Sequence, residues 1–227
     1  MQISKPAICI SYYWGCSSES FIVASNFNDF CRMNYSEYLD KAVEYTSYQS
    51  LFVEKSENPN SYTYGQYIPM NLQRSSRLDR TVKLTEEQVK IAQNAPQQTW
   101  LVISEHWCGD ASQTVPVMAK IAEASQGNIS LRLVYRDEVP ELMQAHLTNG
   151  GMAVPKIVKL DAQNQLINDW GPRPLEAQNL VIKLKSNPET AAKYSEELHK
   201  WYAKDKQQST VKELLELSVA HQVSASF

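Results

Sequence analysis

Residues 100–111 read WLVISEHWCGDA, and this stretch decides how the chain folds. The apolar run over residues 99–104 has the length and composition of a buried β-strand. Residues 109–125, which follow the triplet Trp-Cys-Gly, predict a helix. The first turn of a helix offers unpaired N–H groups and a positive dipole end, and both stabilise a thiolate. The stretch therefore predicts a strand-to-helix turn that presents the sulfur of Cys108.

The pattern continues as an alternation of strands and helices. Three more strands are predicted at residues 129–135, 156–161 and 165–170, and the last two form a hairpin around a polar turn. Helices are predicted between the strands and after them. This order predicts an α/β fold: a mixed central sheet flanked by helices on both faces. Within it, strand 99–104 lies parallel to 129–135.

Helical patterns also precede and follow this alternation. Apolar spacing predicts a helix over residues 34–54, and Thr85-Glu86-Glu87-Gln88 is a capping box that starts another. Asn187-Pro188 is a cap followed by proline at the first helical position. A second capping box is predicted at residues 210–213, which read TVKE.

Composition excludes several classes of partner. The net charge of −3 gives no reason to expect nucleic acid or an anionic membrane. No stretch approaches the roughly 18 apolar residues of a membrane helix. The apolar patch at residues 7–10 is not followed by a clean signal cleavage site, so we expect a cytoplasmic location.

The chain has four cysteines, Cys9, Cys16, Cys31 and Cys108. In the cytoplasm we expect all four to be reduced thiols. The spacing of the first three matches no metal-site pattern and no histidine lies near them, so we expect no metal site.

Three proline and glycine positions carry a family resemblance. Pro116 lies eight residues after Cys108, Val154-Pro155 precedes the predicted hairpin, and Gly171 lies sixteen residues after Pro155. Together with the Trp-Cys-Gly turn and the element order, this pattern resembles the thioredoxin superfamily. The resemblance covers roughly residues 85–186, so the predicted fold is thioredoxin-like with helical extensions at both ends.

Around this region we predict four segments. Residues 1–32 are an extension that precedes a natural start at Met33, and residues 33–84 form an N-terminal helical region. Residues 85–186 are the thioredoxin-like domain, and residues 187–227 are C-terminal helices.

The resemblance implies a role for each residue of the motif. Cys108 would be the nucleophile. Pro155 would form a cis peptide bond with Val154 and face the sulfur, which leaves the Val154 backbone to pair with an extended substrate. The resemblance places the remaining substrate contacts at Trp107, Gly109 and Asp110.

Two departures from the family pattern weaken the catalytic interpretation. Ala111 stands where the resolving cysteine is expected, and Val102 stands where the family has a buried acid. Asp110 in the first helical turn opposes a negative sulfur. A protonated His106 would offset this charge, although we expect His106 to be a surface residue rather than a catalytic one.

Two hypotheses follow. The first is a monothiol thiol-disulfide oxidoreductase, in which Cys108 attacks a protein disulfide or a glutathione adduct. Its mixed disulfide would be released by glutathione or another external thiol, with no other cofactor. The second is a non-catalytic thioredoxin-fold module that binds a protein or peptide beside Cys108 and Pro155. The residues favour thiol chemistry narrowly, and the pKa of Cys108 separates the two hypotheses.

Overall fold

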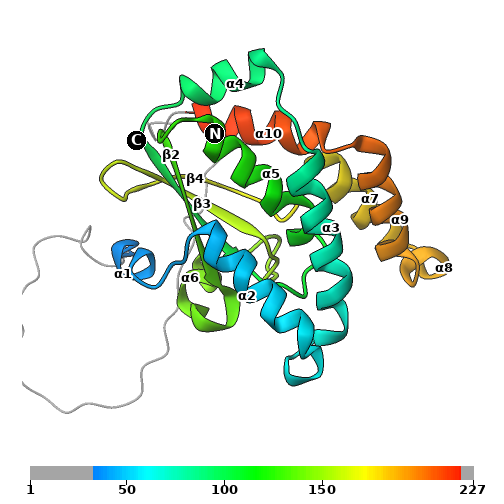
Figure 1. The fold of residues 1–227 in the computed structure, drawn as a ribbon. Helices are drawn as coiled ribbons and strands as arrows, with labels where there is room; N and C mark the ends of the chain where they lie inside the picture. Colours follow the sequence, from blue (N-terminus) through cyan, green and yellow to red (C-terminus); the bar gives the residue numbers. More distant parts are fainter. Residues whose placement is uncertain (1–32, 221–227) are drawn as a thin grey trace, which may run out of the picture. The chain divides into compact units, whose positions relative to one another are not determined.

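A four-stranded mixed sheet lies at the centre of the computed structural model, which describes residues 33–220 (Figure 1). Its strands are β1 (Gln98–Ser104), β2 (Ile129–Tyr135), β3 (Lys156–Asp161) and β4 (Leu166–Trp170), in the order β2-β1-β3-β4. β1 is parallel to β2, and β3 is antiparallel to both β1 and β4. The predicted α/β fold class, the parallel pair and the hairpin are therefore confirmed.

Helices precede, connect and follow the strands. They are α1 (Ser36–Leu39), α2 (Tyr45–Glu57), α3 (Ile68–Thr81), α4 (Glu86–Gln93), α5 (Ala111–Ala124), α6 (Pro140–Ala145), α7 (Leu175–Ser186), α8 (Pro188–Ala191), α9 (Tyr194–Asp205) and α10 (Gln208–Val219). Short 3-10 turns lie at Pro59–Ser61, Gly65–Tyr67 and Arg136–Glu138. Among residues 33–220, no helix is long and apolar enough to cross a membrane. The segment predicted at residues 1–32 lies outside the described residues.

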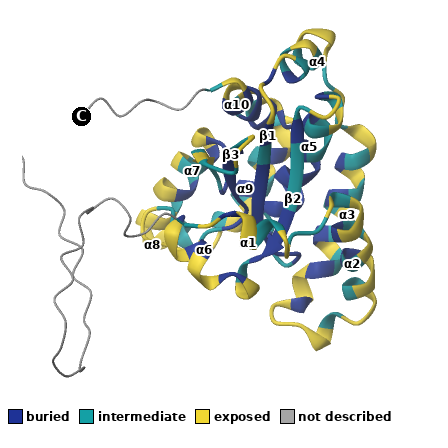
Figure 2. Ribbon diagram, turned by 90° about the vertical axis from the view of Figure 1, so that its left-hand side faces the viewer, coloured by how far each residue is buried: buried dark blue, intermediate teal, exposed yellow. Residues whose placement is uncertain are grey.

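Both faces of the sheet are covered, which explains the unbroken apolar run of β1. Trp100 and Val102 point to one face and Leu101 and Ile103 to the other, and all four are fully buried. Figure 2 shows β1 as buried along most of its length. On the Trp100 face, β1 contacts α2 through Ser104 and α10 through Gln98. The Cys108 turn follows directly from this packed strand.

Two of the predicted helix starts are confirmed. The Thr85 hydroxyl accepts from the Gln88 N–H at 3.2 Å, and the Gln88 side chain accepts from the Thr85 N–H at 2.9 Å. Asn187 caps α8 by accepting from the Glu189 N–H, with Pro188 at the first helical position. These local caps need no tertiary partner, so the sequence alone predicts them.

The helix predicted over residues 34–54 is wrong in its first half. It is divided into α1 and α2, and Val43 between them forms an antiparallel bridge with Leu133. The Val43 N–H donates to the Leu133 carbonyl at 2.8 Å, and the Leu133 N–H donates back at 2.9 Å. β2 is an edge strand with unpaired backbone groups, and satisfying two of them outweighs the helical periodicity.

The capping box predicted at residues 210–213 is also wrong. α10 begins at Gln208, after Lys206 and Gln207 in left-handed conformation, so Thr210 lies inside the helix. Thr210 is fully buried, and its hydroxyl has no partner among the described residues. It lies on the buried face of α10 with Val211 and Leu214, so packing sets the start of this helix.

Lys159 in the middle of β3 attaches the end of α10 to the sheet. Its side chain is fully buried, and Nζ donates to the carbonyls of Leu217 at 2.7 Å, Ser218 at 3.2 Å and Ala220 at 2.6 Å. The last carbonyls of a helix lack intrahelical partners and favour a cation. The Gln98 amide adds a bond to the Ser218 carbonyl at 2.7 Å. β1 and β3 together therefore hold the C-terminal end of α10.

Lys159→Met is expected to destabilise the fold. The substitution keeps an unbranched side chain but leaves buried carbonyls without a donor, which costs about 1–3 kcal/mol. Urea denaturation monitored by circular dichroism measures this change. Lys90→Met on the exposed surface of α4 is the control. Equal unfolding midpoints for the two variants would contradict the role given to Lys159.

Candidate functional site

Cys108 lies in a short turn between the end of β1 and the start of α5. Its N–H donates to the Glu105 carbonyl at 3.1 Å, and its own carbonyl accepts from the Ser112 N–H at 3.2 Å. The Ser112 hydroxyl donates to the Gly109 carbonyl at 2.7 Å. These bonds fix the backbone on both sides of the sulfur, as predicted for a strand-to-helix turn.

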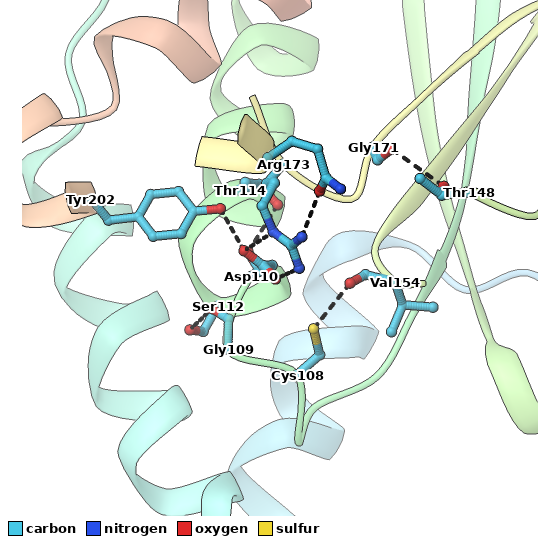
Figure 3. Close-up of polar contacts among 11 residues, drawn as sticks. Cys108, Gly109, Asp110, Ser112, Thr114, Thr148, Val154, Gly171, Arg173 and Tyr202 are labelled. Atoms are coloured by element: carbon cyan, nitrogen blue, oxygen red, sulfur yellow. Dashed lines mark hydrogen bonds and ion pairs between the residues drawn. The ribbon is translucent and has the colours of Figure 1, made fainter. Parts of the chain in front are cut away.

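The sulfur faces the loop that precedes β3 (Figure 3). The Val154–Pro155 peptide bond is cis, and the Cys108 Sγ–H donates to the Val154 carbonyl at 3.1 Å. Cys108 is 8% exposed and Val154 is 5% exposed. The fold thus brings Cys108 and Val154-Pro155 together. The resemblance implies that the Val154 backbone pairs with a substrate. In the structure its carbonyl accepts the Cys108 thiol hydrogen instead.

The surroundings of Cys108 favour the thiol over the thiolate. Burial, with a smaller contribution from the negative charge of Asp110, raises the pKa of Cys108 to about 12. The backbone N–H groups of Ala111 and Asp110 and the cation of Arg173 act in the opposite direction but do not cancel this effect. At neutral pH the sulfur is therefore protonated, and it donates to Val154.

Asp110 is held by two partners from distant parts of the chain (Figure 3). Arg173, just after β4, donates from Nε to Oδ1 at 3.1 Å and from Nη2 to Oδ2 at 2.6 Å. The Tyr202 hydroxyl of α9 donates to Oδ1 at 2.7 Å. Asp110 is 7% exposed, so its charge is buried but paired and hydrogen-bonded.

Sequence reasoning missed both partners of Asp110. Arg173 follows Gly171-Pro172 directly after the last strand. This position is the one sequence feature that places Arg173 near the motif. Tyr202 belongs to a C-terminal helix with no pattern that relates it to residue 110. Neither contact could be read from local spacing.

His106 differs from the expectation of a surface residue whose protonation would offset Asp110. It is 1% exposed, packed between the rings of Tyr48 and Phe52, and its Nε2–H donates to the Tyr48 carbonyl at 3.1 Å. Burial, with a smaller contribution from Lys55, lowers the pKa of His106 to about 3. His106 is therefore a neutral core residue and supplies no charge to the site.

A cleft of about 760 Å³ opens beside the sulfur. Trp107, Cys108, Gly109, Asp110 and Val154 all line it. The other walls come from α3 and the 3-10 turn Gly65–Tyr67 on one side and from α9 and the end of α7 on the other. The motif thus forms only part of the cleft, and the flanking helical regions supply the rest.

Trp107 contacts two side chains of this cleft. Its ring lies 5.2 Å from the ring of Tyr64, and the Arg136 guanidinium lies over it at 4.8 Å. An aromatic ring stacked against a cation is a flat amphipathic surface. Trp107 is half-buried, so part of this surface remains open to a ligand.

The two departures from the family pattern keep their predicted places. Ala111 opens α5 and is 2% exposed, and Val102 is fully buried in β1. Within residues 33–220, Cys108 is the one cysteine, and no three His, Cys, Asp or Glu side chains gather to hold a metal ion. In this part of the chain, nothing near the sulfur replaces a resolving thiol.

Comparison with known proteins agrees with the fold. Residues 58–192 match the Thioredoxin_9 family, described as thioredoxin. A crystal structure of a protein of unknown function, PA1234 from Pseudomonas aeruginosa, is 16% identical with a TM-score of 0.57. The alignment covers 82% of this chain and 96% of that chain. An HIV epitope-scaffold is 14% identical with the same TM-score, over 82% and 97% of the two chains. At these identities the two structures show the fold alone. No curated protein matches the chain significantly.

Asp110→Asn is expected to make Cys108 more reactive, because it removes the negative charge that raises the cysteine pKa and leaves the Arg173 cation nearby. Iodoacetamide alkylation at pH 8 should be about tenfold faster, the change that one pKa unit makes in the thiolate fraction. Cys9, Cys16 and Cys31 are replaced by serine in every sample, so that only Cys108 reacts. Asp137→Asn, at an exposed carboxylate, is the control. An unchanged or slower rate would show that Asp110 does not set the pKa.

Proposed function

Because the chain belongs to the thioredoxin family, we propose that it is a peptide-binding protein that uses the cleft beside Cys108 and Pro155. In this function Cys108 stays a thiol and acts as a hydrogen-bond donor. The observation that carries the proposal is the buried Sγ–H that donates to the Val154 carbonyl at 3.1 Å.

Four features support binding over turnover. Thiol-disulfide exchange needs a thiolate, and the pKa of about 12 leaves almost none at neutral pH. Ala111 supplies no thiol to release a mixed disulfide, and Val102 supplies no proton acceptor. The cleft, in contrast, is large enough for several side chains and joins apolar, aromatic and charged surfaces.

A monothiol oxidoreductase is the second candidate, and one observation favours it. The N–H groups of Asp110 and Ala111 face the sulfur and lower its pKa, as does Arg173. A substrate that takes the place of the Val154 carbonyl and moves Asp110 away from the sulfur would lower the pKa of Cys108. Cys108 would then attack a disulfide, and an external thiol would reduce the mixed disulfide.

The pH dependence of Cys108 alkylation separates the two functions. In protein lacking Cys9, Cys16 and Cys31, we expect the rate to keep rising beyond pH 8.5, the pKa of a free thiol. The physical reason is the burial of Cys108 beside Asp110. A rate that levels off well below that pH would favour the oxidoreductase.

Insulin reduction by dithiothreitol tests turnover directly. Wild type and Cys108→Ser are expected to give equal rates, because a protonated thiol does not attack. Ala111→Cys is expected to add nothing, since a resolving thiol helps only after a mixed disulfide forms. A wild-type rate above that of Cys108→Ser would overturn the binding function, and a gain in Ala111→Cys would show that Cys108 becomes nucleophilic.

A further inference from the structure

The cleft beside Cys108 is positively charged. Of the described charged side chains that line it, four are cations and one, Asp110, is an anion. Arg173 and Tyr202 already bind that carboxylate, so Asp110 is not available to the other three cations. A cleft lined in this way attracts anions and disfavours cations.

Arg74 on α3 is the partly buried cation of the cleft that has no carboxylate partner in the described part of the chain. Arg136 and Arg173 are each paired with an aspartate, and Lys185 is exposed. Its Nη1 donates to the Asn71 side chain at 2.9 Å, and Asn71 in turn donates to the His106 carbonyl at 3.2 Å. In the part of the chain that the structure describes, no carboxylate lies within 4 Å of the guanidinium. Burial and, to a smaller extent, the like charge of Arg77 lower the pKa of Arg74, so its charge has lost hydration without gaining a counter-ion. A guanidinium has five N–H donors, so most of them remain for a ligand.

Gly109 lets Arg74 and His199 approach the motif together. A Cβ atom at Gly109 would lie 3.0 Å from His199 Nε2 and 3.9 Å from Arg74 Nη1. Only glycine leaves room for the imidazole this close to the backbone. Two nitrogen-bearing side chains, one from α3 and one from α9, thus meet above the residue that follows Cys108.

His199 at this position is a neutral group of the cleft. Burial, together with the nearby Arg74, lowers the pKa of His199 to about 4, and its Nδ1 is buried with no partner among the described residues. If the single imidazole hydrogen is on Nε2, His199 can donate it toward Gly109 and the cleft. A guanidinium and an imidazole N–H side by side bind an anionic oxygen group without a second buried charge.

We propose that Arg74 and His199 form a subsite for the anionic side chain of a bound peptide, a carboxylate or a phosphate. This proposal rests on the proposed peptide-binding function and names the chemistry of its ligand. The subsite lies beside Gly109, so the anionic group is held next to Cys108 while the peptide continues along the cleft.

Titration with inorganic phosphate and with succinate tests the subsite. Nuclear magnetic resonance of the His199 imidazole and isothermal calorimetry measure binding. In wild type, one anion or both should shift the His199 resonances. Tighter binding of phosphate assigns a phosphorylated side chain, and tighter binding of succinate assigns an acidic one. The absence of any shift with both anions would overturn the proposal.

Arg74→Gln should raise the dissociation constant about tenfold or more, because charge-assisted hydrogen bonds are lost. Arg80→Gln, further along α3 and exposed, is the matched control and should bind as wild type does. Gly109→Ala is the second variant, since its Cβ would force the His199 ring to move. Wild-type affinity in both Arg74→Gln and Gly109→Ala would also overturn the subsite.

The pH profile of Cys108 alkylation distinguishes a failure of the anion subsite from a failure of the proposed binding function. If the pKa of Cys108 proves to be well below that of a free thiol but Arg74→Gln still loses anion binding, the subsite stands. The proposal that Cys108 stays a thiol then fails. If Cys108 stays protonated and both Arg74→Gln and Gly109→Ala bind anions like wild type, the subsite fails and the binding function stands.

Discussion

The carboxylate of Asp110 joins three parts of the chain that are far apart in sequence. It sits at the first turn of α5, and it receives Arg173 from the loop after β4 and Tyr202 from α9. Breaking a buried ion pair of this kind costs about 3–5 kcal/mol, because the remaining charge is left without compensation. α9 is therefore joined to the motif through a buried charge, and apolar contacts join α9 in turn to α7. The wall of the cleft formed by α9 depends on this link.

Burial and the same carboxylate together raise the pKa of Cys108. An acidic residue two positions after Cys108 opposes a thiolate, although the N–H groups of the helix favour one. Burial and the Asp110 charge both favour the protonated thiol. The Cys108 Sγ–H donates to the Val154 carbonyl. A residue that stabilises the fold thus reduces nucleophilicity. The stability of the motif and its reactivity are in competition at one side chain.

The sheet could be predicted from the sequence because its information is local. β1 has a nearly continuous apolar run, β2 alternates apolar and polar residues, and the capping box at Thr85 is complete within four residues. The errors occurred where a distant partner decided the outcome. Val43 leaves the helical pattern to pair with Leu133, and His106 is enclosed by aromatic rings from α2. Cys108 and Val154-Pro155 could be placed together from the family resemblance, whereas Arg173, Tyr202, Arg74 and His199 could not, because no pattern links elements that only the folded chain brings together.

The contact between Lys159 and the end of α10 has a consequence for folding during synthesis. β3 carries an ammonium group that the sheet buries, and its acceptors are carbonyls of residues 217–220. On the ribosome, β3 emerges nearly sixty residues before these acceptors do. Until then, the part of the sheet that α10 covers stays open, and Lys159 lacks the acceptors that α10 supplies. Strands β1 to β4 are therefore expected to remain loosely assembled until α10 has been made, so that the nascent chain reaches its stable state late and in one cooperative step.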